Sequence, residues 1–429
     1  MHGERSIRVG DITRVEGEGA LHVRIREDRV EELRLDIFEP PRYFEALLRG
    51  RTYLEPVDIT ARICGICPVA YQLTAAQAIE AACGVAVGGP LRELRRLLYC
   101  GEWLQSHALH VYLLHAPDFL GYDGVVDMAR DHPDAVRRGL RLKKAGNRLM
   151  EVVGGRAVHP VNPRVGGFHR APERSELAAL IDPLEQARED ALATLRWAAG
   201  LDFPDLEVDA ELVALGQPGE YPIDRGRIGS SAGLDVEAAE FGAHFTEAQA
   251  PHSTALVSTL RGRTYLVGAL ARYSLSSHLL LPEVRAAAAE AGLGPRCRNP
   301  FRSILVRGVE MLQACGEALA IVRDYRPPDR PFVDVEPRAG EGSACTEAPR
   351  GLLFHRYRLD EEGRILSATI VPPTSQNQLA IEADLRRLVE GGLALRDEEL
   401  ARLCERGVRN HDPCISCAAH FLRLDVDRG

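Results

Sequence analysis

The sequence predicts an α+β protein that is predominantly α-helical, with a core built as a bundle of long helices and small β-sheets at its periphery. Three observations support this fold class. Long stretches repeat apolar residues every three to four positions, which is the helical period. Short stretches towards both ends of the chain alternate apolar and polar residues, which is the strand period. Hydrophobic residues make up 45% of the 429 residues, enough for a sizeable core.

The composition excludes several classes of function. A net charge of −9 at pH 7 offers no basic surface for nucleic acid. The first residues, MHGERSIRVGDITRVEGEG, are charged and have no apolar core, so no secretory signal is expected. No uninterrupted apolar run reaches the roughly 18–20 residues of a membrane span. We therefore expect a cytoplasmic protein whose ten cysteines are thiols or metal ligands rather than disulfides.

The N-terminal part is predicted to contain a β-hairpin. Residues 20–38, ALHVRIREDRVEELRLDIF, alternate apolar and polar positions around a polar turn. Glu16 lies just before this segment, in TRVEGEG. Because a buried carboxylate is costly, Glu16 is either exposed to solvent or functional, and the motif alone favours exposure. A short helix in PRYFEALLRGR follows, with Glu45 at its middle.

The first cysteine pair, Cys64 and Cys67 in RICGICP, precedes a predicted helix that begins at Pro68. The positive end of a helix dipole favours a thiolate over a thiol. This position therefore suits a metal-binding or reactive cysteine.

Three long helices are predicted next. They run from Pro90 to about residue 115, from about Pro133 to Val153, and from Glu173 to Ala199. Asp118 follows the first of them, where a capping or turn role is the default interpretation. A compact loop rich in glycine and proline, residues 154–168, separates the second helix from the third.

From residue 207 to 264 the pattern changes to short strand-like pieces broken by glycine and proline, which predicts a small β-rich insertion. Helices resume in LVGALARYSL, PEVRAAAAEAG and FRSILVRGVEMLQACGEALAIV. Arg350, in EAPRG, then precedes the first of two predicted strands, LLFHRYRLD and GRILSATIVP. Its default interpretation is a surface arginine near an acid. Two amphipathic helices follow, SQNQLAIEADLRRLVEGG and RDEELARLCERG.

The last motif, DPCISCAAH, is predicted as a helix capped by Asp412, with Pro413 at its first position. Cys414 and Cys417 then share one face with His420. Four soft thiolates favour zinc, nickel, copper(I) or iron-sulfur chemistry over magnesium or calcium. The alternatives are a structural zinc site, whose cysteine pairs normally lie about 15–20 residues apart, or a redox or disulfide pair. Two pairs so far apart favour a metal centre held between both ends of the chain.

From TRVEGEG to DPCISCAAH the chain resembles the large subunit of nickel-iron hydrogenases. The paired signatures R-x-C-G-x-C and D-P-C-x-x-C-x-x-H carry the resemblance, and GGRAVHP, EAPRG and VPPTSQN support it. Within the family it looks most like the cytoplasmic, NAD(P)-linked group that includes the sulfhydrogenases. The resemblance implies a single large-subunit domain over residues 1–429. Residues 421–429 would form a tail of the kind that a maturation protease removes from family precursors.

The resemblance also assigns the metal ligands. Cys64 and Cys414 would be terminal thiolates on nickel. Cys67 and Cys417 would bridge nickel to an iron that carries carbon monoxide and cyanide ligands.

Further residues match family positions around these metals. Glu16 matches the glutamate that takes a proton from the terminal thiolate of Cys414. Arg350 matches the arginine held over the metals, with Asp118 and Asp412 as its expected partners.

Two smaller sets of residues complete the implied site. Pro349 and Thr374 fall where family members bond to the cyanides. Glu45 and His420, with a backbone carbonyl near Ile370, would hold a magnesium ion.

The implied activity is reversible heterolytic oxidation of hydrogen and reduction of protons. Electrons would pass to an iron-sulfur small subunit and on to NAD(P) through a flavin-containing module, because this chain has no spare cysteine set for a cluster. Two alternatives stand beside this function. A non-catalytic scaffold related to the quinone-site subunit of respiratory complex I would lack the cysteine pairs. A zinc-stapled binding protein would not need Glu16, Glu45 or Arg350 in their family contexts.

Overall fold

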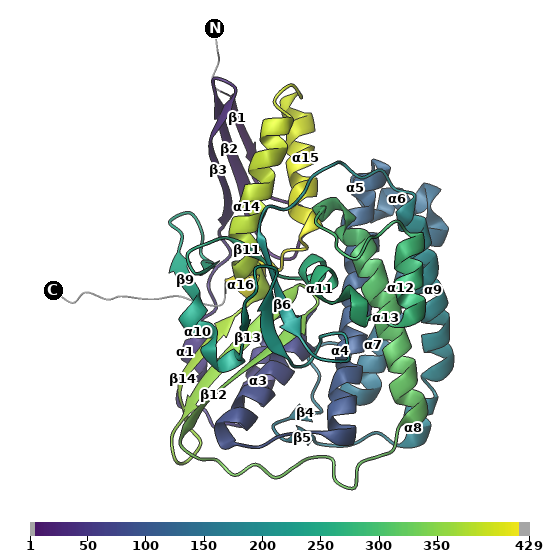
Figure 1. Ribbon diagram of the computed structural model, residues 1–429, viewed down its shortest axis with the longest axis vertical. Helices are drawn as coiled ribbons and strands as arrows, with labels where there is room; N and C mark the ends of the chain where they lie inside the picture. The colour runs from purple at the N-terminus through teal and green to yellow at the C-terminus, as the bar shows by residue number, and fades with distance from the viewer. Residues whose placement is uncertain (1–4, 420–429) are drawn as a thin grey trace, which may run out of the picture.

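The computed structural model describes residues 5–419, and Figure 1 shows long helices on one side of the molecule and most of the strands on the other. The helical body contains four long helices, α4 (Gly89–Leu109), α7 (Pro133–Gly154), α9 (Ile181–Ala199) and α13 (Ser303–Asp324). Helix α4 packs against α7 and α13, and α13 also packs against α9. The fold is therefore α+β and predominantly helical, as predicted.

An antiparallel N-terminal sheet stands at the top of the view in Figure 1. It contains the predicted hairpin, β2 (Gly19–Arg26) and β3 (Arg29–Ile37), and a further edge strand, β1 (Arg5–Val9). The strand period places the apolar side chains of β2 on one buried face. Helices α14 (Pro373–Gly391) and α15 (Asp397–Asn410) cover that face.

A second antiparallel sheet lies against α3 (Pro68–Cys83) and consists of β12 (Gly340–Ala348), β13 (Gly351–Leu359) and β14 (Ile365–Val371). The sequence predicted β13 and β14 but not β12. The β12 sequence, GEGSACTEA, has little intrinsic strand propensity. Its small residues are needed because α3 packs directly on it, and a side chain at Gly342 would collide with the α3 backbone.

The segment from 207 to 264 is rich in short strands, as its sequence pattern predicted. Its strands are β6 (Glu211–Gly216), β7 (Arg227–Ser230), β8 (Asp235–Val236), β9 (Phe245–Gln249) and β10 (Leu256–Leu260). Strand β6 pairs in parallel with β11 (Tyr265–Leu266), just beyond the segment, and packs against β12 and β13.

Two predicted long helices differ from the structure. The segment predicted as one helix from 173 to 199 is divided into α8 (Arg174–Ala178) and α9, because Pro183 fits only in the first turn of a helix. The first long helix leaves α-geometry at residue 110 and continues as a π-helical turn, His110–His115. A separate helix, α5 (Ala116–Leu120), then carries Asp118.

Shorter elements complete the described chain. Within residues 5–419, none of the helices is both long and apolar enough to cross a membrane. The remaining short elements are α1 (Phe44–Leu48), α2 (Pro56–Thr60), α6 (Val125–Asp131), α10 (Phe241–His244), α11 (Ala269–Ser276), α12 (Pro282–Glu290), β4 (Pro163–Arg164) and β5 (Gly167–Phe168).

Candidate metal centre

Four cysteine sulfur atoms, two from each end of the chain, lie within 4.8 Å of one another. The Sγ atoms of Cys64 and Cys414 are 3.5 Å apart, and those of Cys67 and Cys417 are 3.8 Å apart. All four side chains are buried. The structure therefore brings together the two cysteine pairs that the sequence singled out.

The first pair is shaped by the turn that enters α3. Cys64 follows a short 3-10 turn, and Cys67 immediately precedes the helix, as expected from Pro68. The backbone N–H groups of Ile66 and Cys67 donate to the Cys64 sulfur at 3.3 and 3.2 Å. These two bonds favour negative charge on that sulfur.

Two side chains of helix α4 bond to the backbone of this turn. The buried Glu102 carboxylate accepts the backbone N–H groups of Val69 and Ala70, at 2.6 and 3.1 Å. It thereby binds donors that the first turn of α3 leaves without helical partners. One turn further along α4, the Gln105 amide donates to the Ile66 carbonyl at 2.5 Å. The cysteine turn is thus fixed by two side chains that sequence reasoning did not select.

The second pair lies in a tighter segment than predicted. Helix α16 (Ile415–Ala418) spans four residues, so the predicted cap at Asp412 and helix start at Pro413 are wrong. Asp412 adopts a left-handed backbone conformation, with φ of 52°, which aspartate tolerates. The Cys414 N–H instead donates to the Thr374 hydroxyl at 2.9 Å. His420 lies outside the described residues.

Glu16 reaches the cysteines from the N-terminal segment. Its Oε2 accepts a bond from the Cys414 thiol at 3.0 Å and from the Ser416 N–H at 3.1 Å. The Glu16 carbonyl accepts the Ile415 N–H at 2.8 Å, and Glu16 pairs with Cys414 in an isolated parallel bridge. Because Glu16 is half-buried and bonded to a cysteine, the solvent-exposed interpretation does not hold.

Arg350 is buried beside the same cysteines, so the surface interpretation of this arginine is wrong. Its Nε donates to the Asp412 carbonyl at 2.9 Å, and its Nη2 donates to Asp412 Oδ1 at 3.1 Å. Burial opposes the charge, but the negative charges of Asp412 and of the Cys414, Cys67 and Cys64 sulfur atoms outweigh it and raise the Arg350 pKa well above its ordinary value. Among residues 5–419, nothing bonds to its buried Nη1.

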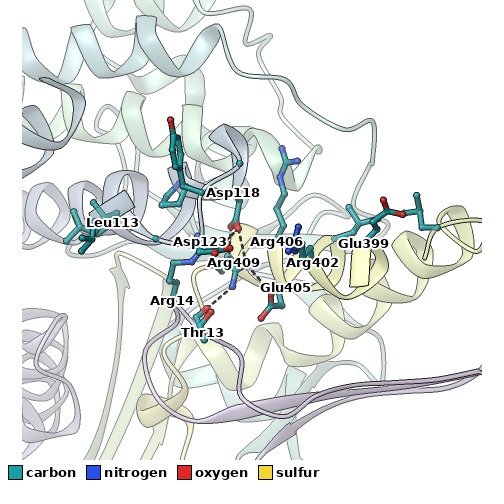
Figure 2. A pocket seen from close by; sticks show the side chains of 18 residues that line it. Thr13, Arg14, Leu113, Asp118, Asp123, Glu399, Arg402, Glu405, Arg406 and Arg409 are labelled. Atoms are coloured by element: carbon teal, nitrogen blue, oxygen red, sulfur yellow. Dashed lines mark hydrogen bonds and ion pairs between the residues drawn. The ribbon is translucent and has the colours of Figure 1, made fainter. Parts of the chain in front are cut away.

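Asp118, which was expected to be a partner of Arg350, is paired elsewhere. Figure 2 shows its carboxylate between Arg409 and Arg14. Arg409 donates to it at 2.7 and 2.9 Å, and Arg14 at 2.6 Å. All three residues line a cavity of about 880 Å³ between α5, α6 and α15. Asp118 therefore forms ion pairs with two arginines other than Arg350, from its position on the separate helix α5.

The expected magnesium residues are only partly described. The Ile370 N–H, on β14, donates to Glu45 Oε1 at 2.7 Å, and α1 packs against β14. The resemblance implied a ligand from the Ile370 carbonyl, whereas this bond uses the Ile370 amide. Burial and the nearby charge of Glu45 raise the pKa of Tyr357 well above its ordinary value.

The electrostatics of the thiols fit a cation at this position. Burial raises the pKa of Cys414 well above its ordinary value, and that of Cys417 is also raised. Burial acts in the same direction on Cys64, but hydrogen bonds from Cys414 and Cys417 and the charge of Arg350 outweigh it and lower the Cys64 pKa. Four buried sulfur donors near the charge of Arg350 suit a soft metal centre, whose binding would draw the remaining protons from the thiols.

Sequence reasoning missed a buried ionic network that contacts the backbone directly before Arg350. Arg272 on α11, Glu310 on α13 and Glu347 on β12 have no exposed surface on their side chains and are ion-paired. A signal was present, because Arg272 stands in the apolar run LVGALARYSL and Glu310 in ILVRGVEMLQ. A charged residue inside an apolar helix is rarely buried unless it is paired.

Comparison with known proteins gives consistent matches over nearly the whole chain. The family described as nickel-dependent hydrogenase matches residues 42–137. Sulfhydrogenase 1 subunit alpha of Pyrococcus furiosus is 33% identical over 97% of this chain and 98% of its own length. The NAD-reducing hydrogenase HoxS subunit beta of Cupriavidus necator is 27% identical over 97% and 95%. A crystal structure of an NAD+-reducing [NiFe]-hydrogenase superimposes with a TM-score of 0.88 at 25% identity, over 98% of this chain and 100% of that chain.

The fold and the buried four-sulfur site define a metal-dependent oxidoreductase subunit. The chain belongs to the nickel-dependent hydrogenase family. It is a catalytic large subunit for hydrogen oxidation and proton reduction, and its four-cysteine site fits a nickel-iron centre. These matches do not support the scaffold or zinc-staple alternatives.

Proposed function

We propose that this chain is the catalytic subunit of a nickel-iron hydrogenase that exchanges electrons with NAD(P). One observation carries the proposal: four buried sulfur atoms converge, and one of them, on Cys414, donates to the carboxylate of Glu16. A relative named as NAD-reducing covers 97% of the chain, which favours a nicotinamide acceptor.

We assign the four cysteines to two ligand pairs, as a two-metal centre would require. Cys64 and Cys414 would be terminal ligands of nickel, and Cys67 and Cys417 would bridge nickel and iron. The sulfur atoms within each proposed pair are 3.5 and 3.8 Å apart, and those of Cys414 and Cys417 are 2.7 Å apart, so all four lie close enough to share one centre. When bound, the nickel-iron group would supply the centre at which the hydrogen molecule is split.

The protein's own contribution is to receive and place protons. Glu16 can hold a proton at Oε2, at 3.0 Å from the Cys414 sulfur, which is within the reach needed for proton transfer between the two groups. Arg350 presents its charge to the sulfur atoms, and Asp412 fixes the direction of the guanidinium through two bonds. A buried cation there would stabilise negative charge that develops during the reaction.

Other residues would hold the remaining ligands of the centre. Pro349 and Thr374 would contact cyanide on iron, which would also carry carbon monoxide. Thr374 already accepts the N–H of Cys414, so it lies next to the centre. Glu45, His420 and the backbone of Ile370 would bind a magnesium ion.

The protein would act as part of a cytoplasmic complex and form one domain over residues 1–429, with 207–264 as an insertion. An iron-sulfur small subunit would carry electrons, and a flavin-containing module would pass them to NAD(P). Residues 421–429 would be removed by a maturation protease. The relatives are named as subunits, which supports an assembly of several chains.

Metal analysis and infrared spectroscopy of the purified complex test this function. We expect about one nickel per copy of this chain, iron in excess of nickel because the small subunit carries iron-sulfur clusters, infrared bands from metal-bound carbon monoxide and cyanide, and hydrogen-dependent reduction of NAD or NADP. Cys417→Ser should lose the nickel and the infrared bands, whereas Cys345→Ser, a buried cysteine in the β12 strand, should keep both. Zinc as the sole bound metal would contradict the proposal.

A further inference from the structure

Every N–H group of the Arg272 guanidinium has an acceptor. Nε and Nη2 donate to the two oxygens of Glu310 at 2.8 and 2.7 Å, and Nη1 donates to Glu347 at 3.0 Å. The remaining donors reach the carbonyls of Ala348 and Pro349, each at 2.9 Å. A guanidinium has five N–H donors, so two of them are used on the backbone directly before Arg350.

The backbone that Arg272 supports is a tight turn. Strands β12 and β13 pair up to Ala348 and Gly351, and Pro349 and Arg350 alone connect them. Two-residue hairpin turns normally have a positive φ at their first position, because that matches the twist of the strands. Proline fixes φ near −65° and excludes it. This turn therefore depends on contacts from outside the hairpin.

A second contact comes from the residue before α11. Gly268 has a φ of +111°, and a Cβ at this position would lie 2.8 Å from the carbonyl oxygen of Arg350. Gly351, at the other end of the turn, has a φ of +137° and packs against Val267. Gly268 thus lies against the turn at Arg350, while Arg272, one turn further along α11, binds the two carbonyls before Arg350.

We infer that Arg272 is a positioning residue for Arg350. By binding the carbonyls of Ala348 and Pro349 it fixes the peptide plane from which the Arg350 side chain extends towards Asp412. The inference rests on the proposed role of Arg350 in turnover. The competing interpretation is that Arg272 only neutralises the buried carboxylates of Glu310 and Glu347, which would affect stability but not turnover.

Arg272→Lys tests the inference while keeping the buried positive charge. An ammonium has three donors and cannot reproduce the planar arrangement of five. The assay is catalytic isotope exchange between deuterium gas and the protons of water, measured on the assembled, metal-loaded enzyme. The rate of this exchange should fall about 10–100-fold, the size expected from a small displacement of a catalytic group. Gly268→Ala pushes on the same turn without changing any charge and should lower exchange in the same way. It provides a second route if the lysine variant does not fold.

A double-variant comparison separates positioning from stability. In an Arg350→Lys background, Arg272→Lys should cause no further loss of exchange, yet it should lower the melting temperature as much as it does alone. Tyr221→Phe removes a 2.9 Å bond to Glu310 in the same network without touching the turn, and should leave exchange unchanged. Nickel and iron content is measured in every variant, so that loss of metal is not mistaken for loss of positioning.

The outcomes are distinct. Full exchange activity in Arg272→Lys, or losses that multiply in the double variant, would overturn the inference alone. Full activity in Arg350→Lys would overturn both the inference and the proposed role of Arg350.

Discussion

Replacing Glu16 with glutamine tests the proton-transfer step most directly. Glutamine keeps the size of the side chain and an oxygen that can accept the Ser416 N–H, now at 3.1 Å from Oε2. It removes the group that can take a proton from the Cys414 sulfur at 3.0 Å. A positioned general base contributes about 10²- to 10⁴-fold to a rate. At about 1.36 kcal/mol per tenfold, this is roughly 2.7–5.4 kcal/mol of transition-state stabilisation.

The assay is hydrogen-dependent electron-acceptor reduction by the assembled enzyme, normalised to bound nickel. Glu16→Gln should keep its metals and lose turnover by about 100-fold or more. Glu18→Gln is the matched control, because Glu18 lies two residues away and is exposed, so turnover should not change. Full turnover in Glu16→Gln, with metals bound, would remove Glu16 from the proton path.

Further predictions concern stability and are checked by denaturant unfolding. Asp118→Ala should cost about 3–5 kcal/mol, because it removes the closer of the two acids paired with buried Arg409, at 2.7 Å, and leaves Glu405 at 3.7 Å; a cost below about 1 kcal/mol would show that the Asp118 pair is unimportant. Burial opposes ionisation of Asp118, but Arg409 outweighs it and lowers the Asp118 pKa, so the carboxylate stabilises the fold above the unfolded pKa of about 4. The difference between wild type and Asp118→Ala should therefore shrink as the pH falls below about 4, and a constant difference would contradict this assignment. Glu102→Gln should cost about 1–3 kcal/mol, since an amide oxygen cannot serve Val69 and Ala70 as two carboxylate oxygens do; unchanged unfolding would mean that this cap contributes nothing.

Local sequence pattern was sufficient for elements with a strong period or a clear terminator. The β2–β3 hairpin alternates cleanly, and Pro68 marks the start of α3, so both were predicted near their observed positions. The cysteine pairs were found because two identical spacings stand in specific flanking residues. Strand β12 was missed because its small, polar residues are set by contact with α3 rather than by any local preference.

The partners of charged groups were predicted only in part, since Asp412 bonds to Arg350 as the resemblance implied but Asp118 does not. Asp118 was assigned to Arg350 by resemblance, but the break after the π-helical turn places it beside Arg14 and Arg409. The short helix α16 differs from prediction for a related reason, since Asp412 bonds to Arg350 instead of capping the helix. Such partners are set by tertiary contacts between residues far apart in the chain, which a single sequence does not reveal.

The position of the two cysteine pairs has a consequence for biosynthesis. Cys64 and Cys414 are 350 positions apart, yet Glu16 and Cys414 lie side by side as neighbouring backbone segments. A ribosome therefore releases the first half of the ligand set long before the second half exists. Until translation passes Cys417, the nascent polypeptide carries an incomplete thiol site, and any metal delivered early would have only two of its four sulfur donors.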